Sequence, residues 1–180
     1  MSLEVGMGSE VAAQLGAQVG LEGGSEVGTP QRHCAVAVGI QTPTRRVLDT
    51  NIVLDLWVFD EPRAEALRSS LERGSTQWLA TAAMREELAR VLAYPQIAKR
   101  LMHRQLPASA VLGHFDRWAQ LQPDAPKAPY ACKDADDQKF IDLAVAHTAT
   151  LHSKDAQVLC MKKRLERCGV ALNPPLSSPV

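Results

Sequence analysis

The sequence predicts an α/β fold in which a central parallel sheet is flanked by helices. Short apolar segments with strand character alternate with longer helical segments, and proline or glycine residues mark many of their ends. The chain has 180 residues, of which 46% are hydrophobic and 22% charged, as is usual for one soluble domain. Strands that alternate with helices build parallel sheets, and such sheets bind ligands at the carboxyl ends of their strands.

The predicted strands are short and apolar, and acidic residues stand just past two of them. Asp49 directly follows the first strand, and Asp155 lies just past the third. Because the strands are expected to be parallel, these side chains should lie on one rim of the sheet. The predicted strands are residues 45–48, 76–80, 150–152 and 170–172.

Helices are expected to connect the strands. Pro62 suits the first turn of a helix and Gly74 its end, and Thr81 is a favourable N-cap residue. Pro107 separates two further helices, and a proline-rich connector follows them. The predicted helices span residues 52–59, 62–73, 82–93, 97–104, 109–121, 135–149 and 156–168.

The folded domain is expected over residues 44–172. Residues 1–43 are rich in Gly, Ala, Val, Gln and Glu, and they show no helical or alternating period. Such a segment buries too little apolar surface to offset the entropy of ordering it. We expect residues 1–43 to be a disordered or weakly structured leader, or to precede the true start of translation. Residues 173–180 are expected to form a proline-rich tail.

The charge balance and the cysteines limit the function classes. The chain has 20 Lys and Arg residues and 20 Asp and Glu residues, which argues against a protein that coats nucleic acid through bulk charge. No apolar run is long enough to span a membrane, and no secretory signal is visible. The four cysteines are widely spaced and form no CxxC pair, as in reduced proteins. We therefore expect a cytoplasmic protein without a membrane partner.

Glu87 is expected to point inward from its helix. It lies three residues after Met84 and four before Val91, which share the apolar face. A buried carboxylate is costly unless it is paired, hydrogen-bonded or bound to a metal ion. A buried charged partner, such as an arginine, is the alternative to a metal ion. The neighbouring Glu86 is assigned to a solvated ion pair with Arg90, four residues later.

Three further acids, Asp134, Asp136 and Asp137, stand at the start of a later helix. Asp134 is expected to be its N-cap, where a carboxylate is favourable. Asp137 shares an apolar face with Phe140 and Ile141, so the capping explanation is weaker for it. Spacing alone leaves the role of Asp136 open.

Four carboxylates are thus expected near the strand ends on one rim of the sheet. Helix capping remains the alternative for Asp49 and Asp155 taken singly, but no single cap explains a cluster. Crowded carboxylates repel one another, and a hard divalent cation such as Mg²⁺ or Mn²⁺ relieves this repulsion. Such an ion activates water and stabilises charge on a phosphate. The cluster predicts metal-dependent phosphodiester hydrolysis by Asp49, Glu87, Asp137 and Asp155.

The acidic motifs resemble those of the PIN-domain family in their order and spacing. The matching motifs are Asp49-Thr50-Asn51, Glu87 with Leu88, Asp134-Ala135-Asp136-Asp137 and Ser153-Lys154-Asp155. The resemblance covers about residues 45–172 and extends to VapC-related bacterial toxins of toxin–antitoxin pairs. It implies a three-layer α/β/α fold and a Mg²⁺- or Mn²⁺-dependent endoribonuclease that cleaves single-stranded or structured RNA.

The same resemblance implies roles for individual residues. Asp137 is preferred over Asp136 as the third acid, because it precedes Ser153 by the sixteen residues typical of the family. Lys154 replaces the glycine usual in the family, and it would either contact phosphate or weaken metal binding. The catalytic and metal-binding residues would be Asp49, Glu87, Asp137 and Asp155. The supporting residues would be Thr50, Asn51, Asp134, Asp136 and Ser153.

Partners and alternatives follow from the resemblance as well. The expected partners are RNA, a cognate antitoxin protein and a second copy of the chain. Two basic clusters, around Arg100 and around Lys163, are assigned to solvated helix faces, and Arg46 is placed outside the site. The main alternative is a catalytically inactive PIN-like module that binds RNA or a protein. A phospho-aspartate receiver or phosphatase is disfavoured, because Asn51 stands where the phosphatase motif has a second Asp.

Overall fold

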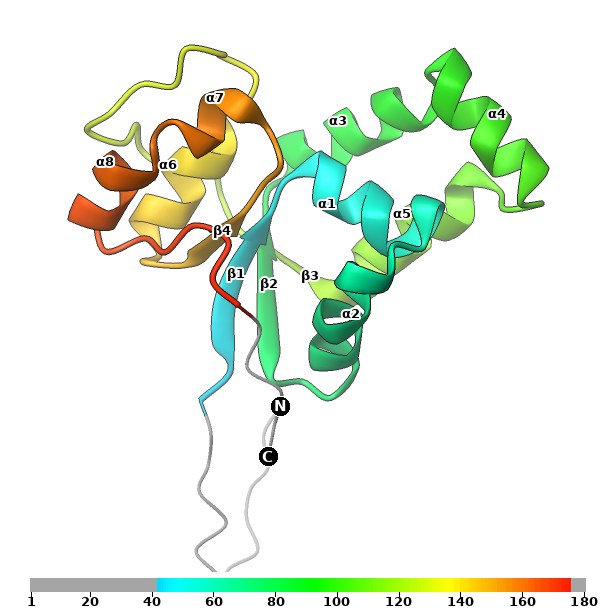
Figure 1. Cartoon of the computed structure of the whole chain (residues 1–180), viewed down its shortest axis with the longest axis horizontal. Helices are drawn as coiled ribbons and strands as arrows, with labels where there is room; N and C mark the ends of the chain where they lie inside the picture. Colours follow the sequence, from blue (N-terminus) through cyan, green and yellow to red (C-terminus); the bar gives the residue numbers. More distant parts are fainter. Residues whose placement is uncertain (1–41, 176–180) are drawn as a thin grey trace, which may run out of the picture. The chain divides into compact units, whose positions relative to one another are not determined.

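The core of the fold is a four-stranded sheet in which every strand pair is parallel. A computed structural model describes residues 42–175 (Figure 1). Most of the predicted leader over residues 1–43, and the end of the predicted tail, therefore lie outside the described residues. The strands are β1 Thr44–Leu48, β2 Thr76–Ala80, β3 Ala119–Leu121 and β4 Thr150–His152. They lie in the order β3-β2-β1-β4.

Helices connect the strands, as the alternating sequence pattern predicts. A π-helix, η1, continues directly from α1, and a short 3₁₀ turn, η2, precedes α2. The elements are α1 Thr50–Leu54, η1 Asp55–Phe59, η2 Pro62–Ala64, α2 Glu65–Glu72, α3 Ala82–Leu92, α4 Pro95–His103, α5 Ala108–Trp118, α6 Gln138–Ala146, α7 Ala156–Leu159 and α8 Lys162–Arg167.

The helices form one layer on each side of the sheet. Figure 1 shows α6, α7 and α8 on one side of the strands, and α1, α2 and α5 on the other. Contacts of α6 with β1 and β4, and of α2 with β2, hold the two layers against the sheet. This arrangement confirms the predicted three-layer α/β/α fold. No helix among residues 42–175 has the length and apolar character needed to cross a lipid bilayer.

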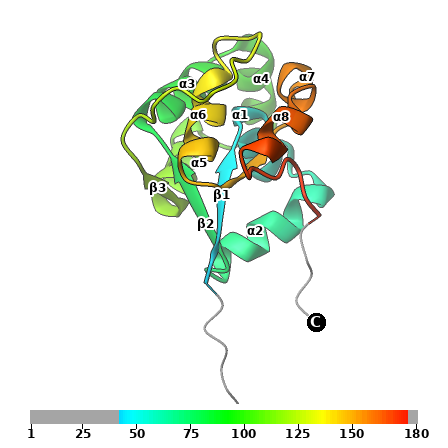
Figure 2. The same cartoon turned by 90° about the vertical axis from the view of Figure 1, so that its left-hand side faces the viewer.

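The parallel register brings the strand ends together. Val47 of β1 pairs with Leu79 of β2 and with Leu151 of β4, so the three strands end at nearly the same level. Figures 1 and 2 show the chain passing from the end of β1 directly into α1. The residues that follow these strands therefore meet at one rim, where ligands bind in parallel sheets.

Local signals in the sequence position several helices correctly. The Thr81 hydroxyl accepts a hydrogen bond from the Met84 amide over 3.4 Å and caps α3. Gly74 follows α2 at a positive φ of 70°, which glycine adopts without steric strain. Pro95 occupies the first turn of α4, which therefore begins two residues before the predicted start. Proline has no backbone N–H, but the N–H groups of the first turn have no partner within the helix, so no hydrogen bond is lost.

The predicted helix over residues 109–121 is wrong at its end. Helix α5 stops at Trp118, and Ala119–Leu121 forms the edge strand β3. Ala119 pairs with Trp78 and Leu121 with Ala80. These residues lack the alternating pattern of an independent strand, and hydrogen bonds from β2 determine their conformation.

Three further predictions at the carboxyl-terminal side also need correction. Residues 170–172 form an isolated bridge from Leu172 to Leu151 and not a strand. The predicted helix over residues 156–168 divides into α7 and α8 around Met161, which is buried. Helix α6 begins at Gln138, three residues later than predicted, because residues 135–137 form a turn.

Candidate functional site

Asp49 is buried at the end of β1. It occupies the position before α1, but its carboxylate makes no capping hydrogen bond, so capping does not explain it. Only 2% of the residue is exposed. The Ser153 hydroxyl donates to Asp49 Oδ2 over 2.6 Å, and the Asn51 amide approaches the same oxygen at 3.5 Å. Burial raises the pKa of Asp49, the charge of Glu87 adds to this effect, and the hydrogen bonds from Ser153 and Asn51 oppose it.

Glu87 extends from α3 toward the same rim, on the inward side that the helical spacing predicts. Its side chain is 18% exposed. The Thr50 hydroxyl donates to Glu87 Oε1 over 2.6 Å. The other oxygen, Oε2, forms an ion pair with the ammonium group of Lys139 on α6. The alternative expected for this carboxylate, a charged protein partner, is therefore present, with Lys139 in place of an arginine.

Asp137 carries the strongest electrostatic signal of the site. Burial, followed by the charges of Asp155, Asp49, Asp134 and Glu87, raises its pKa to about 7. Charges act on one another more strongly inside a protein than in bulk water. Carboxylates from three other stretches of the chain thus act on Asp137, and the convergence of all four acids on one site stays a prediction.

Ser153 connects two members of this cluster. Its hydroxyl donates to Asp49 and accepts a hydrogen bond from the backbone N–H of Asp155 over 3.0 Å. Asp155 begins α7, and its Oδ1 accepts from the Gln157 amide over 2.6 Å. The capping alternative is therefore correct for Asp155. Its charge nevertheless acts on Asp137, so capping does not remove it from the cluster.

Asp134 and Asp136 are both exposed. Asp134 is not the N-cap of α6, contrary to the prediction, because the helix begins four residues later. Its Oδ1 accepts instead from the backbone N–H of Asp136 over 2.9 Å and closes a turn. The backbone carbonyl of Asp136 accepts from Lys139. Of the two side chains, that of Asp134 contributes to the raised pKa of Asp137.

Two charged contacts near the rim were not predicted. Lys154 forms an ion pair with Asp55, a buried residue of η1, which gives it a structural partner besides the two roles considered for it. Lys139 follows Asp137 by two residues. This closeness in sequence to the acidic residues is the only signal that could have indicated a role for Lys139 at the rim. Sequence spacing does not reveal which carboxylate a lysine reaches.

The buried polar groups further down the sheet belong to a different arrangement. Arg46 Nη1 lies 2.7 Å from His152 Nε2, and Arg46 Nε donates to the Thr76 hydroxyl over 3.3 Å. Burial, together with the charge of Arg46, lowers the pKa of His152 to about 4. His152 is therefore neutral near pH 7, and Arg46 serves the packing of the sheet.

The residues of the rim match the chemistry of a hard divalent cation. All the candidate ligands are carboxylate oxygens, which Mg²⁺ and Mn²⁺ prefer. Asp137 Oδ2 is buried without a hydrogen-bond partner among the described residues, and such an atom is stabilised by a cation. Within residues 42–175, however, no three Asp, Glu, His or Cys side chains already converge on one metal position. Side-chain rotations would be needed to close the cluster around an ion.

Comparison with known proteins gives one result for this chain. Residues 45–155 match the family model described as the PIN domain. The match begins at the second residue of β1 and ends at Asp155, so it includes every residue of the rim cluster. No curated protein matches the chain.

Proposed function

Since the chain belongs to the PIN-domain family, whose members are generally nucleases that use divalent metal ions and bind RNA, we propose that it is a Mg²⁺- or Mn²⁺-dependent endoribonuclease. The observation that supports this proposal most directly is the raised pKa of Asp137, to about 7, by burial and four neighbouring carboxylates. A buried group of like charges is unfavourable for folding and is typical of functional sites.

In this proposal Asp49, Glu87, Asp137 and Asp155 bind the ion. The ion would supply positive charge that acidifies water and stabilises the phosphate undergoing hydrolysis. Ser153 and Thr50 hold Asp49 and Glu87 in position through hydrogen bonds of 2.6 Å each. Such hydroxyl groups orient the carboxylates before substrate arrives. Asn51, Asp134 and Asp136 would assist at the edge of the site.

The first test replaces Asp49 with Asn and measures cleavage of single-stranded RNA in the presence of Mg²⁺ or Mn²⁺. We expect cleavage to be lost while the circular dichroism spectrum is unchanged, because Asn keeps the shape of the side chain and removes its charge. The matched control is Asp124→Asn, in the exposed connector between β3 and α6, and it should cleave like the wild type. Full activity of the purified Asp49 variant would refute the assignment.

The ion pair of Lys139 with Glu87 favours a second candidate function. An ammonium group at this carboxylate supplies the charge that a metal ion would otherwise bring, so the domain could bind RNA or a protein without cutting. Calorimetric titration with Mn²⁺ near neutral pH separates the two functions. Measurable binding supports the nuclease, and its absence supports the inactive module.

A biological role as a cytoplasmic toxin is a further part of the proposal. It is supported by the resemblance of the acidic motifs to those of VapC-related proteins. Expression of the wild type should arrest bacterial growth, and Asp49→Asn should abolish the arrest. Coexpression of a small protein encoded next to the gene should relieve it, if that protein is the cognate antitoxin. Light scattering would establish whether the chain forms the proposed homodimer.

A further inference from the structure

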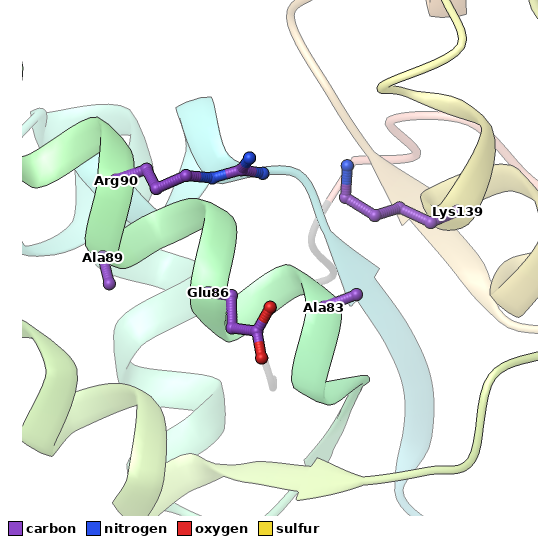
Figure 3. A pocket seen from close by; sticks show the side chains of 5 residues that line it. All are labelled: Ala83, Glu86, Ala89, Arg90 and Lys139. Carbon is purple, nitrogen blue, oxygen red and sulfur yellow. The ribbon is translucent and has the colours of Figure 1, made fainter.

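A pocket of about 420 Å³ lies between α3 and α6, next to the acidic rim. Figure 3 shows the five side chains that line it. Lys139 connects the pocket directly to the rim, because its ammonium group is also the partner of Glu87. The lining residues are Ala83, Glu86, Ala89, Arg90 and Lys139.

Arg90 presents a positive charge to this pocket and has no ion-pair partner among residues 42–175. The ion pairs among residues 42–175 involve Arg68, Arg85, Arg104, Lys139 and Lys154, but not Arg90. The ion pair expected between Glu86 and Arg90 is therefore not formed. Figure 3 shows the Glu86 carboxylate directed away from the Arg90 guanidinium.

Lys139 reaches the pocket from the opposite helix. Figure 3 shows the side chains of Arg90 and Lys139 extending toward each other. An ammonium group has three N–H donors. In Lys139, one of them contacts the Glu87 carboxylate and another the Asp136 carbonyl. One donor is therefore left for a ligand in the pocket. The two cations form a positively charged end that suits an anion, while Ala83 and Ala89 provide a small apolar wall.

We propose that this pocket binds a phosphate of the RNA chain next to the phosphate that is cleaved, with Arg90 and Lys139 as its charged contacts. The inference rests on the proposed nuclease function. A guanidinium and an ammonium group suit the oxygens of a phosphodiester. Because Lys139 contacts Glu87, the bound phosphate lies beside the catalytic acids. The charge of Glu86 restricts the phosphate to the end of the pocket formed by Arg90 and Lys139.

The position of Arg90 in its helix offers a different explanation. Arg90 lies in the last turn of α3, where positive charge is favourable for the helix dipole. Arg100 provides a matched control, because it is an exposed arginine in the last turn of α4 and does not line the pocket. A role confined to the helix dipole predicts that Arg90→Gln and Arg100→Gln have the same effect on RNA binding.

The decisive experiment measures binding of a fluorescein-labelled single-stranded oligoribonucleotide by anisotropy. It uses the full chain in EDTA at several salt concentrations. We expect Arg90→Gln to raise Kd about tenfold, as for loss of one charge-assisted contact. The slope of log K against log salt should fall by about 0.7, the value for one phosphate on a single strand. Arg100→Gln should leave both quantities near the wild-type values. Equal effects of the two substitutions would overturn the inference.

A second pair of variants tests the pocket without changing charge. Ala83→Met fills the pocket, whereas Ala82→Met places the same side chain on the neighbouring exposed position of α3. Only Ala83→Met should weaken RNA binding, and equal affinities would contradict the proposed site. Because EDTA prevents metal-dependent cleavage, binding is measured independently of catalysis. If the wild type binds RNA through Arg90 but does not cleave it, the proposed nuclease function is refuted and the proposed phosphate site is supported.

Discussion

Two groups of buried polar residues in the same sheet differ in how their charges are satisfied. In a group centred on Arg46, in the middle of β1, Arg46 contacts His152 and Thr76, and Thr76 contacts Ser70 over 2.9 Å. At the carboxyl-end rim, burial and several carboxylates raise the pKa of Asp137, and one of its oxygens is buried without a hydrogen-bond partner in the described part of the chain. The first group uses its hydrogen bonds internally and stabilises the fold. In the second group the repulsion between carboxylates is not offset by hydrogen bonds, and a bound cation, as proposed, would relieve it.

The largest expected effect is on activity at the rim. Glu87→Gln keeps the side-chain shape and the acceptor for the Thr50 hydroxyl, but it removes the negative charge. RNA cleavage should fall by on the order of hundredfold or more, as for loss of one electrostatic contact to the transition state. Steady-state cleavage assays measure this, with Glu72→Gln at the exposed end of α2 as control. If the cleavage rate falls by less than threefold, on the order of 0.6 kcal/mol, Glu87 is not part of the catalytic site.

A smaller effect is expected when a supporting hydroxyl is removed. Ser153→Ala takes away the donor that holds Asp49 and the acceptor for the Asp155 amide. Mn²⁺ affinity should fall about 10–100-fold, which is typical of residues that orient metal ligands. Calorimetry measures the change, and Ser109→Ala on an exposed turn of α5 serves as control. Unchanged Mn²⁺ affinity would restrict Ser153 to a structural role.

The group centred on Arg46 should respond in stability and not in metal binding. Arg46→Met removes the partner of the buried His152 ring nitrogen and one of the two partners of the Thr76 hydroxyl, so the free energy of unfolding should fall by about 1–3 kcal/mol. Urea denaturation measures this change, and Arg45→Met, at the exposed neighbouring position, should have little effect. Loss of Mn²⁺ binding by a folded Arg46 variant would show that the two groups are not independent.

A further effect concerns stability and pH at Asp137. Its pKa is about 7 in the fold and 3.8 in the unfolded chain, so folding favours its protonated form. The stability this provides is full below pH 3.8 and is lost as the pH rises toward 7. In EDTA, Asp137→Asn should therefore raise Tm above pH 7 and lose this advantage toward pH 4.

Added Mg²⁺ provides the counterpart of the pH measurement. It should raise Tm of the wild type above pH 7 by binding the native state, and it should raise that of Asp137→Asn less. The control Asp124→Asn should follow the wild type throughout. A pH-independent Tm difference between the wild type and Asp137→Asn would contradict the electrostatic origin of the shift.

The sequence by itself determined most elements of the fold. Strands β1, β2 and β4 and the start of α3 follow from local composition and from the Thr81 cap. Their alternation with helices is sufficient to predict a parallel sheet, and therefore a rim where Asp49 and Asp155 meet. The inward direction of Glu87 also follows, because helical periodicity fixes which residues share a face.

Only the tertiary structure decided the contacts among distant charges. Strand β3 exists because β2 supplies its hydrogen bonds, and Glu87 pairs with Lys139 because α3 and α6 face each other across the rim. The pairing of Lys154 with Asp55, and the lack of an ion-pair partner for Arg90 within residues 42–175, have the same origin. Local propensity acts over a few residues, whereas burial and Coulomb interactions depend on distances that exist only once the sheet has formed.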